Sequence, residues 1–315
     1  MSPPSYMYLT AIPNQDAELI NAECRALTGH APSSYGIAIS ERCVDVKRGA
    51  YVKSCTEILF EAGSLAEICG QIKSAELHAE DFRVSVVRFP RNLHVDTMKI
   101  AHSVGGLIGG RVCLTEPRVI FLMAVTSEKI WFGRLLSESD GGWVAHQKRP
   151  YTTSSSLPTR LARAMINLIA CPDDRLLDPC CGTGTIVLEA AQMGMEAVGY
   201  DINPNMVDAT RANLTHYGLN ATVYLGDAGQ ISEHFDVVAT DLPYGIMLTS
   251  DITRDKKILQ NLHRISAKAV FVDVRDLSGQ LVNLGYNIKQ VIHAPKYSIV
   301  RRIFITNTGS SRAGC

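Results

Sequence analysis

The sequence predicts an α/β fold whose C-terminal half contains an open, mostly parallel β-sheet. Three observations lead to this prediction. After Ser156, short apolar strands alternate with amphipathic helices; a glycine-rich turn joins the first strand to its helix; and four consecutive strands end in polar residues. The carboxyl ends of parallel strands meet at one edge of a sheet, where open α/β folds usually bind their ligands. We therefore expect a binding site at this edge.

Length and composition limit the class of protein. A chain of 315 residues can hold more than one domain and a substantial core. No apolar run is long enough to cross a bilayer, and the start, Met1–Ser5, lacks the pattern of a signal peptide. Nine irregularly spaced cysteines without a CxxC pair predict free, mostly buried thiols, no metal centre and a cytoplasmic location.

The formal net charge is zero, with 31 basic and 31 acidic residues. Neither side of Pro150 has a basic excess, which counts against binding of long duplex nucleic acid. A small RNA recognised by its shape needs fewer phosphate contacts. Local basic clusters are candidates for such contacts, and solvated surface charge explains each equally well. They are Arg83, Arg88 and Arg91, then Lys148 and Arg149, then Arg301 and Arg302.

The N-terminal half is predicted to form two small α+β modules followed by a linker at 146–155. The first module, residues 1–75, is expected to contain strands at 6–12, 35–39 and 58–60 and helices at 14–29 and 64–72. The second, residues 76–145, is expected to contain an alternating strand at 82–88, a helix at 95–108 and a hairpin formed by 118–125 and 129–135. Periodicity alone does not indicate what either module binds.

A glycine turn follows the strand that ends at Asp178. Its residues are Cys180, Cys181, Gly182, Thr183 and Gly184, directly before an amphipathic helix. Glycines let backbone amides approach a ligand closely, and a helix N-terminus adds partial positive charge. The turn is not a dinucleotide fingerprint, because Leu188 stands where a third small residue is expected. It is not a Walker loop either, since no Lys-Ser/Thr pair follows.

Two later strands end in acids at the spacing of a nucleoside site. Asp201 ends the strand 197–201 about twenty residues after the glycines, where a ribose diol would be held. Asp227 follows the strand 221–225, where an adenine amino group can be bound. Ile202 and Ala228, the next residues along the chain, belong to the same predicted site. Taken singly, each acid is also explained as the cap of a helix or turn.

The fourth strand, 236–240, ends in the tetrapeptide Asp241-Leu242-Pro243-Tyr244. The Asp241 carboxylate and the Leu242 carbonyl can both accept a hydrogen bond from an amino group. Pro243 holds that carbonyl in an extended geometry, and Tyr244 offers a flat face for a ring. The tetrapeptide therefore predicts a site that grips a planar, amino-bearing ring; the plainer alternative is a strand-to-loop turn.

The turn from Asp178 to Thr185, the acids Asp201 and Asp227, and the tetrapeptide together resemble class I S-adenosylmethionine-dependent amino-methyltransferases that act on nucleic acids. The acidic tetrapeptide is similar to the guanine-N2 branch, as is the predicted helix at 156–164. The resemblance implies a Rossmann-like methyltransferase domain over residues 156–315 with a seven-stranded sheet. The helix at 254–267, the strand at 270–274 and an antiparallel hairpin of 286–292 with 299–305 complete that pattern.

The same resemblance implies a role for each residue of the site. Gly182 and Gly184 face the methionine moiety of the cofactor, Asp178 its amino group, Asp201 the ribose and Asp227 the adenine. The implied cofactor-binding residues are Asp178, Cys180, Gly182, Thr183, Gly184, Asp201, Ile202, Asp227, Ala228 and Asp241. The implied catalytic residues are Asp241, Leu242, Pro243 and Tyr244, and no metal is implied.

In the N-terminal half, the second module resembles a THUMP domain, an RNA-binding module of tRNA-modifying enzymes, and the first resembles the ferredoxin-like domain that precedes it. The overall order is similar to archaeal enzymes that methylate N2 of guanosine ten in tRNA. In that family the THUMP module engages the acceptor end. The alternative is that both modules are structural or form a dimer.

The resemblance implies methyl transfer from S-adenosylmethionine to N2 of a tRNA guanosine at position ten, with one or two methyl groups added. Its implied partners are tRNA and a small activating protein subunit. Alternatives are a different tRNA position, ribosomal RNA, DNA, and a cofactor-binding RNA-binding subunit without activity. The intact tetrapeptide argues against the last, because a binding module does not need it.

Overall fold

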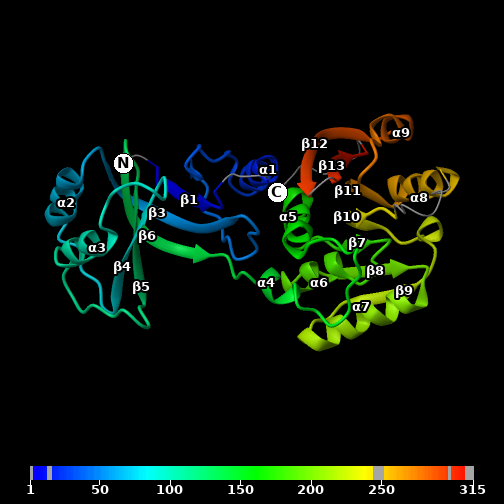
Figure 1. Ribbon diagram of the computed structural model, residues 1–315, viewed down its shortest axis with the longest axis horizontal. Helices are drawn as coiled ribbons and strands as arrows, with labels where there is room; N and C mark the ends of the chain where they lie inside the picture. Colours follow the sequence, from blue (N-terminus) through cyan, green and yellow to red (C-terminus); the bar gives the residue numbers. More distant parts are fainter. Residues whose placement is uncertain (1–2, 13–15, 244–251, 297–298, 309–315) are drawn as a thin grey trace. The chain divides into compact units, whose positions relative to one another are not determined.

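Two β-sheets organise the chain in a computed structural model (Figure 1). The structure describes residues 3–12, 16–243, 252–296 and 299–308. The chain divides into two compact units. Unit 1 comprises Met1–Pro13, Leu27–Lys47 and Tyr51–Ser139. Unit 2 comprises Asn14–Ala26, Arg48–Ala50 and Asp140–Cys315.

Unit 1 contains a six-stranded sheet in the order β2-β1-β3-β6-β5-β4. Its strands are β1 (Tyr6–Thr10), β2 (Ile37–Ser40), β3 (Val52–Ala62), β4 (Phe82–Arg88), β5 (Val119–Val125) and β6 (Ile130–Glu138). Helices α2 (Leu65–Ser74) and α3 (Thr97–Gly105) pack on the sheet around Phe82, Phe121 and Phe132. Because β3 pairs with both β1 and β6, strands from both predicted N-terminal modules share one sheet. The division at residue 75 stays a prediction.

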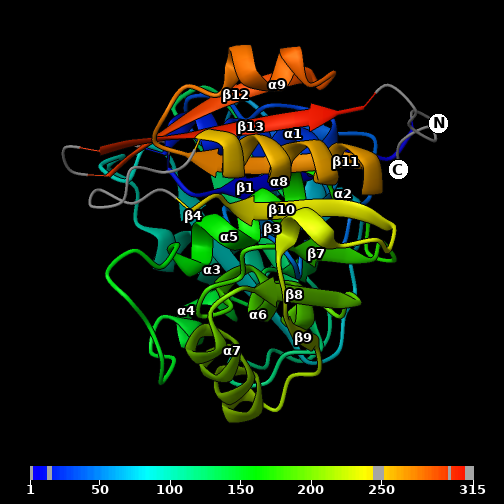
Figure 2. The same ribbon diagram turned by 90° about the vertical axis from the view of Figure 1, so that its right-hand side faces the viewer.

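Unit 2 contains the predicted seven-stranded sheet, which is confirmed with the order β12-β13-β11-β10-β7-β8-β9 (Figure 2). The strands are β7 (Leu176–Asp178), β8 (Ala197–Asp201), β9 (Thr222–Leu225), β10 (Phe235–Asp241), β11 (Ser266–Asp273), β12 (Asn287–Lys296) and β13 (Ile299–Asn307). Strands β7 to β11 pair in parallel, whereas β13 is antiparallel to β11 and β12. The parallel strands therefore place their carboxyl ends at one edge.

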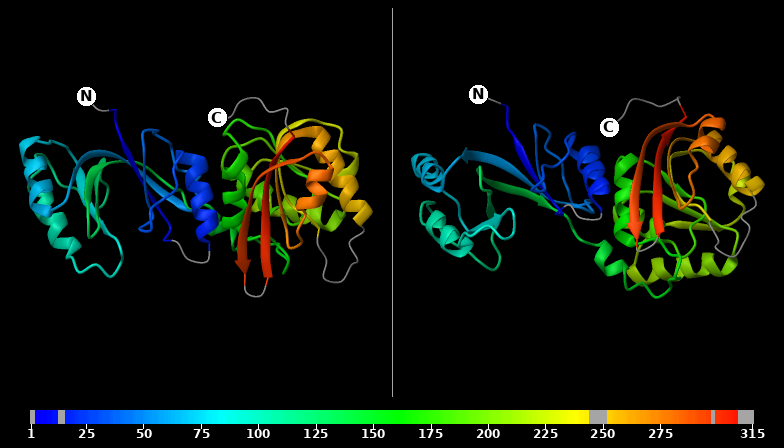
Figure 3. Two further views of the ribbon diagram at one scale, coloured as in Figure 1. Left: turned by 90° about the horizontal axis from the view of Figure 1, so that it is seen from above. Right: turned by 45° about the horizontal axis from the view of Figure 1, so that its top comes forward.

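Helices cover both faces of this sheet (Figure 3). They are α4 (Trp143–His146), α5 (Thr159–Ile169), α6 (Thr185–Gln192), α7 (Pro204–Tyr217), α8 (Ile252–Ile265) and α9 (Ser278–Asn283), with a short 3₁₀ helix, η1 (Ala228–Gln230). Helices α8 and α9 pack over Leu177, Val238 and Phe271. Alternate residues of a strand point to opposite faces, so Leu176 and Val237 face the other layer, where α5 and α6 contact the strands.

Most of helix α1 (Ala17–Thr28) belongs to unit 2, together with the short segment Arg48–Ala50. Glu23 is fully buried and accepts hydrogen bonds from the Ala50 backbone amide (2.8 Å) and from Asn167 Nδ2 (2.6 Å). The Arg48 side chain donates to Asn167 Oδ1 (2.7 Å). The chain that precedes β2 therefore contributes to the core of the C-terminal unit, an arrangement that local periodicity cannot predict.

Several sequence-based expectations are wrong in detail. The helix expected at 156–164 begins at Thr159, and α4 and α9 were not expected. Arg149 and Arg301 are buried, so these two are not surface cations available to RNA. Among the described cysteines seven are free, but only Cys24, Cys55 and Cys181 of these are buried, and Cys171 is disulfide-bonded. Over the described ranges, we find no helix with the length and apolar character needed to span a membrane.

Candidate active site

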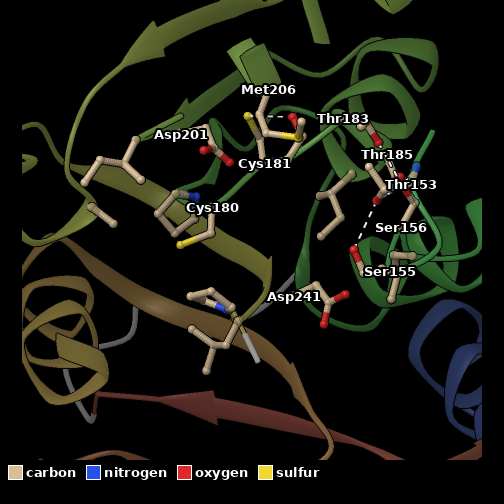
Figure 4. A pocket seen from close by; sticks show the side chains of 18 of the residues that line it. Thr153, Ser155, Ser156, Cys180, Cys181, Thr183, Thr185, Asp201, Met206 and Asp241 are labelled. Carbon is tan, nitrogen blue, oxygen red and sulfur yellow. Dashed lines mark hydrogen bonds between the residues drawn. The ribbon is translucent and has the colours of Figure 1, made fainter. Parts of the chain in front are cut away.

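A cavity of about 270 Å³ lies at the carboxyl edge of the unit 2 sheet (Figure 4). Strands β7, β8, β9 and β10 end beside it, so residues far apart in the sequence meet there. Of the residues predicted from sequence, ten line the cavity: Cys180, Gly182, Thr183, Asp201, Ile202, Asp227, Ala228, Asp241, Leu242 and Pro243. Asp178 and Gly184 lie behind this lining, and Tyr244 lies outside the described residues.

The glycine turn adopts a backbone that needs glycine. Gly182 and Gly184 have φ of +53° and +83°, in the left-handed region that side chains disfavour. A Cβ on Gly184 would come within 2.5 Å of Thr210 Cγ2, well inside van der Waals contact. The Thr210 hydroxyl donates to the Gly182 carbonyl at 2.7 Å. The turn thus packs directly on α7 and leads into α6 with its first amides near the cavity.

Asp201 connects the glycine turn to helix α7. Its Oδ2 accepts a hydrogen bond from the Gly182 amide and its Oδ1 accepts one from the Asn203 amide, both at 2.8 Å. Asp227 makes comparable local contacts, accepting from the Gly229 amide (2.9 Å) and from Gln230 Nε2 (3.2 Å). The capping role that is the plainer alternative for each acid is therefore present, and both side chains also line the cavity.

Asp178 is buried at the end of β7, where the Cys180 amide donates to its Oδ1 at 3.3 Å. Burial raises its pKa from 3.8 to about 8, and the negative charges of Asp201 and Asp241 contribute to the rise. Burial also raises the pKa of the neighbouring Cys181 thiol. Three carboxyl groups therefore lie at neighbouring strand ends, and those of Asp201 and Asp241 line the cavity, where a positively charged ligand would relieve their repulsion.

Asp241 is the last residue of β10 and its side chain borders the cavity (Figure 4). The following residue, Leu242, is buried, and its amide donates to the Val272 carbonyl of β11 at 3.0 Å. Pairing with β11 therefore fixes the backbone immediately after the carboxylate, while Pro243 is exposed. This geometry leaves the Asp241 carboxylate at the junction between the cavity and the ends of β10 and β11.

The segment before α5 forms a wall of the cavity; it spans the end of the linker predicted at 146–155 and the start of the helix predicted at 156–164. Ser156 Oγ lies 3.0 Å from Thr183 Oγ1 and accepts from the Thr153 amide at 2.9 Å. Asn213 of α7 accepts from the Tyr151 amide and donates to the Thr183 carbonyl, both at 2.9 Å. The hydroxyl-rich run at 152–156 was the available signal. The unpredicted lining residues are Thr153, Ser155, Ser156, Leu157, Pro179, Cys181, Thr185, Ile186, Met206, Gly226 and Ile258.

A buried ionic cluster supports the start of α6 from behind. Glu189 is fully buried and contacts His146 Nδ1 (2.6 Å) and Arg163 Nε (2.7 Å). Arg149 donates to the Thr185 hydroxyl at 2.9 Å, at the first residue of α6. Burial lowers the pKa of Arg149. This cluster ties α4 and α5 to the helix whose N-terminus follows the glycine turn.

Comparisons with known proteins agree with this geometry. The family model described as UPF0020, RMKL-like, methyltransferase domain, matches residues 146–276. The chain is 36% identical over 177 residues to the tRNA (guanine(10)-N2)-dimethyltransferase of Pyrococcus abyssi, covering 51% of this chain and 53% of that protein. It is 35% identical over 121 residues to the probable enzyme of the same name from Methanothermococcus thermolithotrophicus, covering 35% of this chain and 74% of that protein. The chain belongs to the tRNA guanine-N2-methyltransferase family.

Within this family, the chain aligns with only part of its curated relatives. It spans 53% of the Pyrococcus abyssi protein and, at 31% identity, 66% of the protein of the same name from Methanothermobacter thermautotrophicus. Among solved structures, TrmN from Thermus thermophilus is similar, with a TM-score of 0.51, 18% identity, and coverage of 96% of this chain and 99% of that chain. That likeness shows the fold.

The cavity fits the cofactor expected for a methyltransferase family. S-adenosylmethionine carries an ammonium and a sulfonium, and the carboxylates of Asp201 and Asp241, which line the cavity, supply the opposite charge, with the Asp178 carboxyl buried beside them. Gly182, Gly226 and Asp227 line the part of the cavity beside the ends of β8 and β9. Among residues placed in the structure, no group of three or more His, Cys, Asp and Glu is arranged to hold a metal ion.

Proposed function

We propose that this protein transfers a methyl group from S-adenosylmethionine to the exocyclic N2 of guanosine ten in tRNA. One observation supports this above the others: the Asp241 carboxylate borders the same cavity as the glycine turn and Asp201. An amino group held at Asp241 would lie beside a cofactor held by the turn. The names of the archaeal relatives support tRNA, N2 and position ten.

We assign the cofactor to the carboxyl ends of β7, β8 and β9. Asp178 would bind the amino group of the methionine moiety, Asp201 the ribose and Asp227 the adenine amino group. The remaining proposed cofactor contacts are Cys180, Gly182, Thr183, Gly184, Ile202, Ala228 and Asp241, and Ser156 is added from its place in the wall. When bound, S-adenosylmethionine supplies an activated methyl group, so the reaction needs no metal.

The nitrogen that accepts the methyl is a poor nucleophile because its lone pair is delocalised into the guanine ring. Asp241 and the Leu242 carbonyl would accept hydrogen bonds from the N2–H groups, which localises this lone pair and aims it. Asp241 would then take up the proton that N2 loses. Much of the rate would come from in-line positioning. Pro243 would hold the Leu242 carbonyl, and Tyr244 would stack on the flipped guanine.

We further propose that the N-terminal region binds the tRNA, with a ferredoxin-like domain at 1–75, a THUMP domain at 76–145 and a linker at 146–155 before the methyltransferase domain at 156–315. A small activating subunit is a proposed partner. The edge strand β9 supports this, because it pairs only with β8 among the described strands and exposes Tyr224 and Leu225. Seven of the eight described cysteines are free thiols, which supports a cytoplasmic location, although Cys171 is disulfide-bonded.

A labelling experiment tests the proposal. Purified protein is incubated with radiolabelled S-adenosylmethionine and an unmodified tRNA transcript, and the labelled nucleoside is identified and mapped by nuclease digestion. Label in N2-methylguanosine, or in N2,N2-dimethylguanosine, at position ten is the expected result. A transcript with adenosine at position ten is the matched control and should stay unlabelled. Label at another guanosine would agree with the proposed N2-methylation but refute position ten as its site. No label in any RNA would refute the proposed activity.

A further inference from the structure

Arg275 lies between two buried carboxylates, just after the carboxyl end of β11. Its Nη2 donates to Asp273 Oδ2 at 2.6 Å and its Nε donates to Asp273 Oδ1 at 3.0 Å. Its Nη1 donates to Asp255 Oδ2 at 2.8 Å. The side chains of Asp273 and Asp255 are 0% and 5% exposed, whereas that of Arg275 is 33% exposed. The guanidinium therefore joins the end of a strand to the first turn of α8.

This ion cluster is directly beside the proposed catalytic segment. Strands β10 and β11 are parallel neighbours, with Asp241 opposite Val272, and the Leu242 amide bonds the Val272 carbonyl at 3.0 Å. Asp273 is the next residue after Val272. The backbone that holds Asp241 and Leu242 is therefore hydrogen-bonded to the strand end that carries the Arg275 cluster.

Helix α8, which carries Asp255, also contacts the other side of the cavity. Asn261 of α8 donates from Nδ2 to the carbonyls of Ala228 and Ile231, both at 2.9 Å, in the segment that follows Asp227. Ile258, one turn earlier, lines the cavity. Helix α8 thus spans from the loop proposed to hold adenine to the end of β11 beside Asp241 (Figure 2). Arg275 fixes the second of these two attachments.

A second arginine, Arg175, also bridges two carboxylates but lies away from the site. Arg175 immediately precedes β7, at the opposite edge of the same sheet, and its side chain is 32% exposed. It also bridges two carboxylates, Glu196 and Glu233, but these are 68% and 45% exposed. Burying two carboxylates with one guanidinium costs desolvation that such a surface brace avoids. The buried cluster, that of Arg275, lies at the edge of the sheet where the reaction is proposed, and there the accurate placement of the reacting groups has the greatest effect.

We propose that Arg275 is a positioning residue for methyl transfer, which holds α8 against the β10–β11 edge and so sets Asp241 and Leu242 relative to the bound cofactor. This inference rests on the proposed function. Arg275 acts through Asp273 and Asp255, without a role in chemistry of its own. Because small displacements of reacting groups reduce rates steeply, the effect falls on the transfer step and leaves cofactor affinity largely intact.

The test compares Arg275→Met with Arg175→Met in the full-length protein. The rate of methyl transfer is measured in single turnovers at saturating S-adenosylmethionine and tRNA. Isothermal titration calorimetry gives the dissociation constant for S-adenosylhomocysteine, and differential scanning calorimetry gives the melting temperature. We expect Arg275→Met to slow transfer by about 10- to 100-fold while the dissociation constant changes by less than about threefold. Arg175→Met should transfer at a rate close to wild type. Arg275→Lys keeps the positive charge but loses the guanidinium donors that bond both carboxylates, so its transfer rate should lie between those of wild type and Arg275→Met.

Asp255→Asn provides a second variant that does not depend on the folding of Arg275→Met. It keeps the size of the side chain, removes one charge of the cluster, and should slow transfer in the same direction. Equal rates for Arg275→Met and Arg175→Met, or a loss of rate that parallels an equal loss of cofactor affinity, would overturn the proposal. Activity of the wild type on a different nucleoside would refute the proposed function alone, since the rate comparison still applies; no transfer by the wild type would refute both.

Discussion

The Oδ2 atom of Asp201 accepts a hydrogen bond from the backbone amide of Gly182 at 2.8 Å, across 19 residues of sequence. The acid proposed to hold the ribose is therefore also a support of the glycine turn. Its second oxygen caps the segment that begins α7 through the Asn203 amide. Recognition of the ligand and the shape of the turn thus depend on one carboxylate.

Replacement of Asp201 by alanine should weaken cofactor binding and stability together. Two backbone amides lose their acceptor, and the ribose loses its proposed partner. The half-buried Gly182 amide, left without an acceptor, costs about 1–3 kcal/mol. We expect at least a tenfold increase in the dissociation constant for S-adenosylhomocysteine, measured by calorimetry. Asp208→Ala, an exposed acid on α7, is the matched control and should bind normally. Normal affinity in Asp201→Ala would contradict the role.

Replacement of Asp241 by asparagine should remove methyl transfer while the cofactor still binds. The amide keeps the size of the side chain but cannot take up the N2 proton, and the loss of such a group typically costs about 10²- to 10⁴-fold. Single-turnover transfer to tRNA measures the rate, and calorimetry with S-adenosylhomocysteine provides the control. Transfer at the wild-type rate would remove Asp241 from its proposed role.

The raised pKa of Asp178 predicts a pH dependence of stability for the protein without cofactor. Because its folded pKa, about 8, lies above its ordinary value of 3.8, Asp178 favours folding most at low pH. Its contribution is fully present below about pH 4 and is lost as the pH rises through about 8. Thermal unfolding between pH 5 and 9 should show a decline in wild type that Asp178→Asn lacks. The same pH dependence of the melting temperature in wild type and Asp178→Asn would contradict this role of Asp178.

Local patterns were sufficient to predict the acidic residues that end β7, β8 and β10. Asp178, Asp201 and Asp241 each follow a short apolar run, and parallel strands bring such ends together whatever the details of packing. The glycine turn was predictable for the same reason, since Gly184 needs a positive φ. Strand ends and turns are specified by residues adjacent in sequence.

Contacts between distant residues were not predictable. Nothing near Glu23 indicates that it bonds Asn167, 144 residues away, and nothing near Asn213 indicates that it holds Tyr151. A polar residue on a helix resembles any solvated residue until its partner is placed. For this reason the sequence places Thr153 in the predicted linker and Ser156 at the start of the predicted helix, and neither in the predicted site, although the hydroxyl-rich run is visible. The single sheet shared by the described strands of both N-terminal modules was not predictable either, because it depends on the pairing of β3 with β6, which lie far apart in the sequence.

Replacement of Glu189 by alanine should destabilise the C-terminal unit strongly. Glu189 and Arg163 are both fully buried, and they pair at 2.7 Å, with His146 on the other carboxylate oxygen. Removing the carboxylate leaves a buried guanidinium without this counter-ion, which costs about 3–5 kcal/mol in comparable cases. Urea unfolding followed by circular dichroism measures the free energy of unfolding of each variant.

The exposed acid Glu196 offers the matched control for this prediction. It pairs with Arg175 at 2.6 Å but is 68% exposed, so Glu196→Ala should cost less than about 1 kcal/mol. The double variant Glu189→Leu/Arg163→Met removes both buried charges and should recover part of the loss, because it replaces an ionic pair with apolar contacts. Equal costs for Glu189→Ala and Glu196→Ala would show that burial does not govern this cluster. In that case its link to the start of α6, through Arg149 and Thr185, would need another explanation.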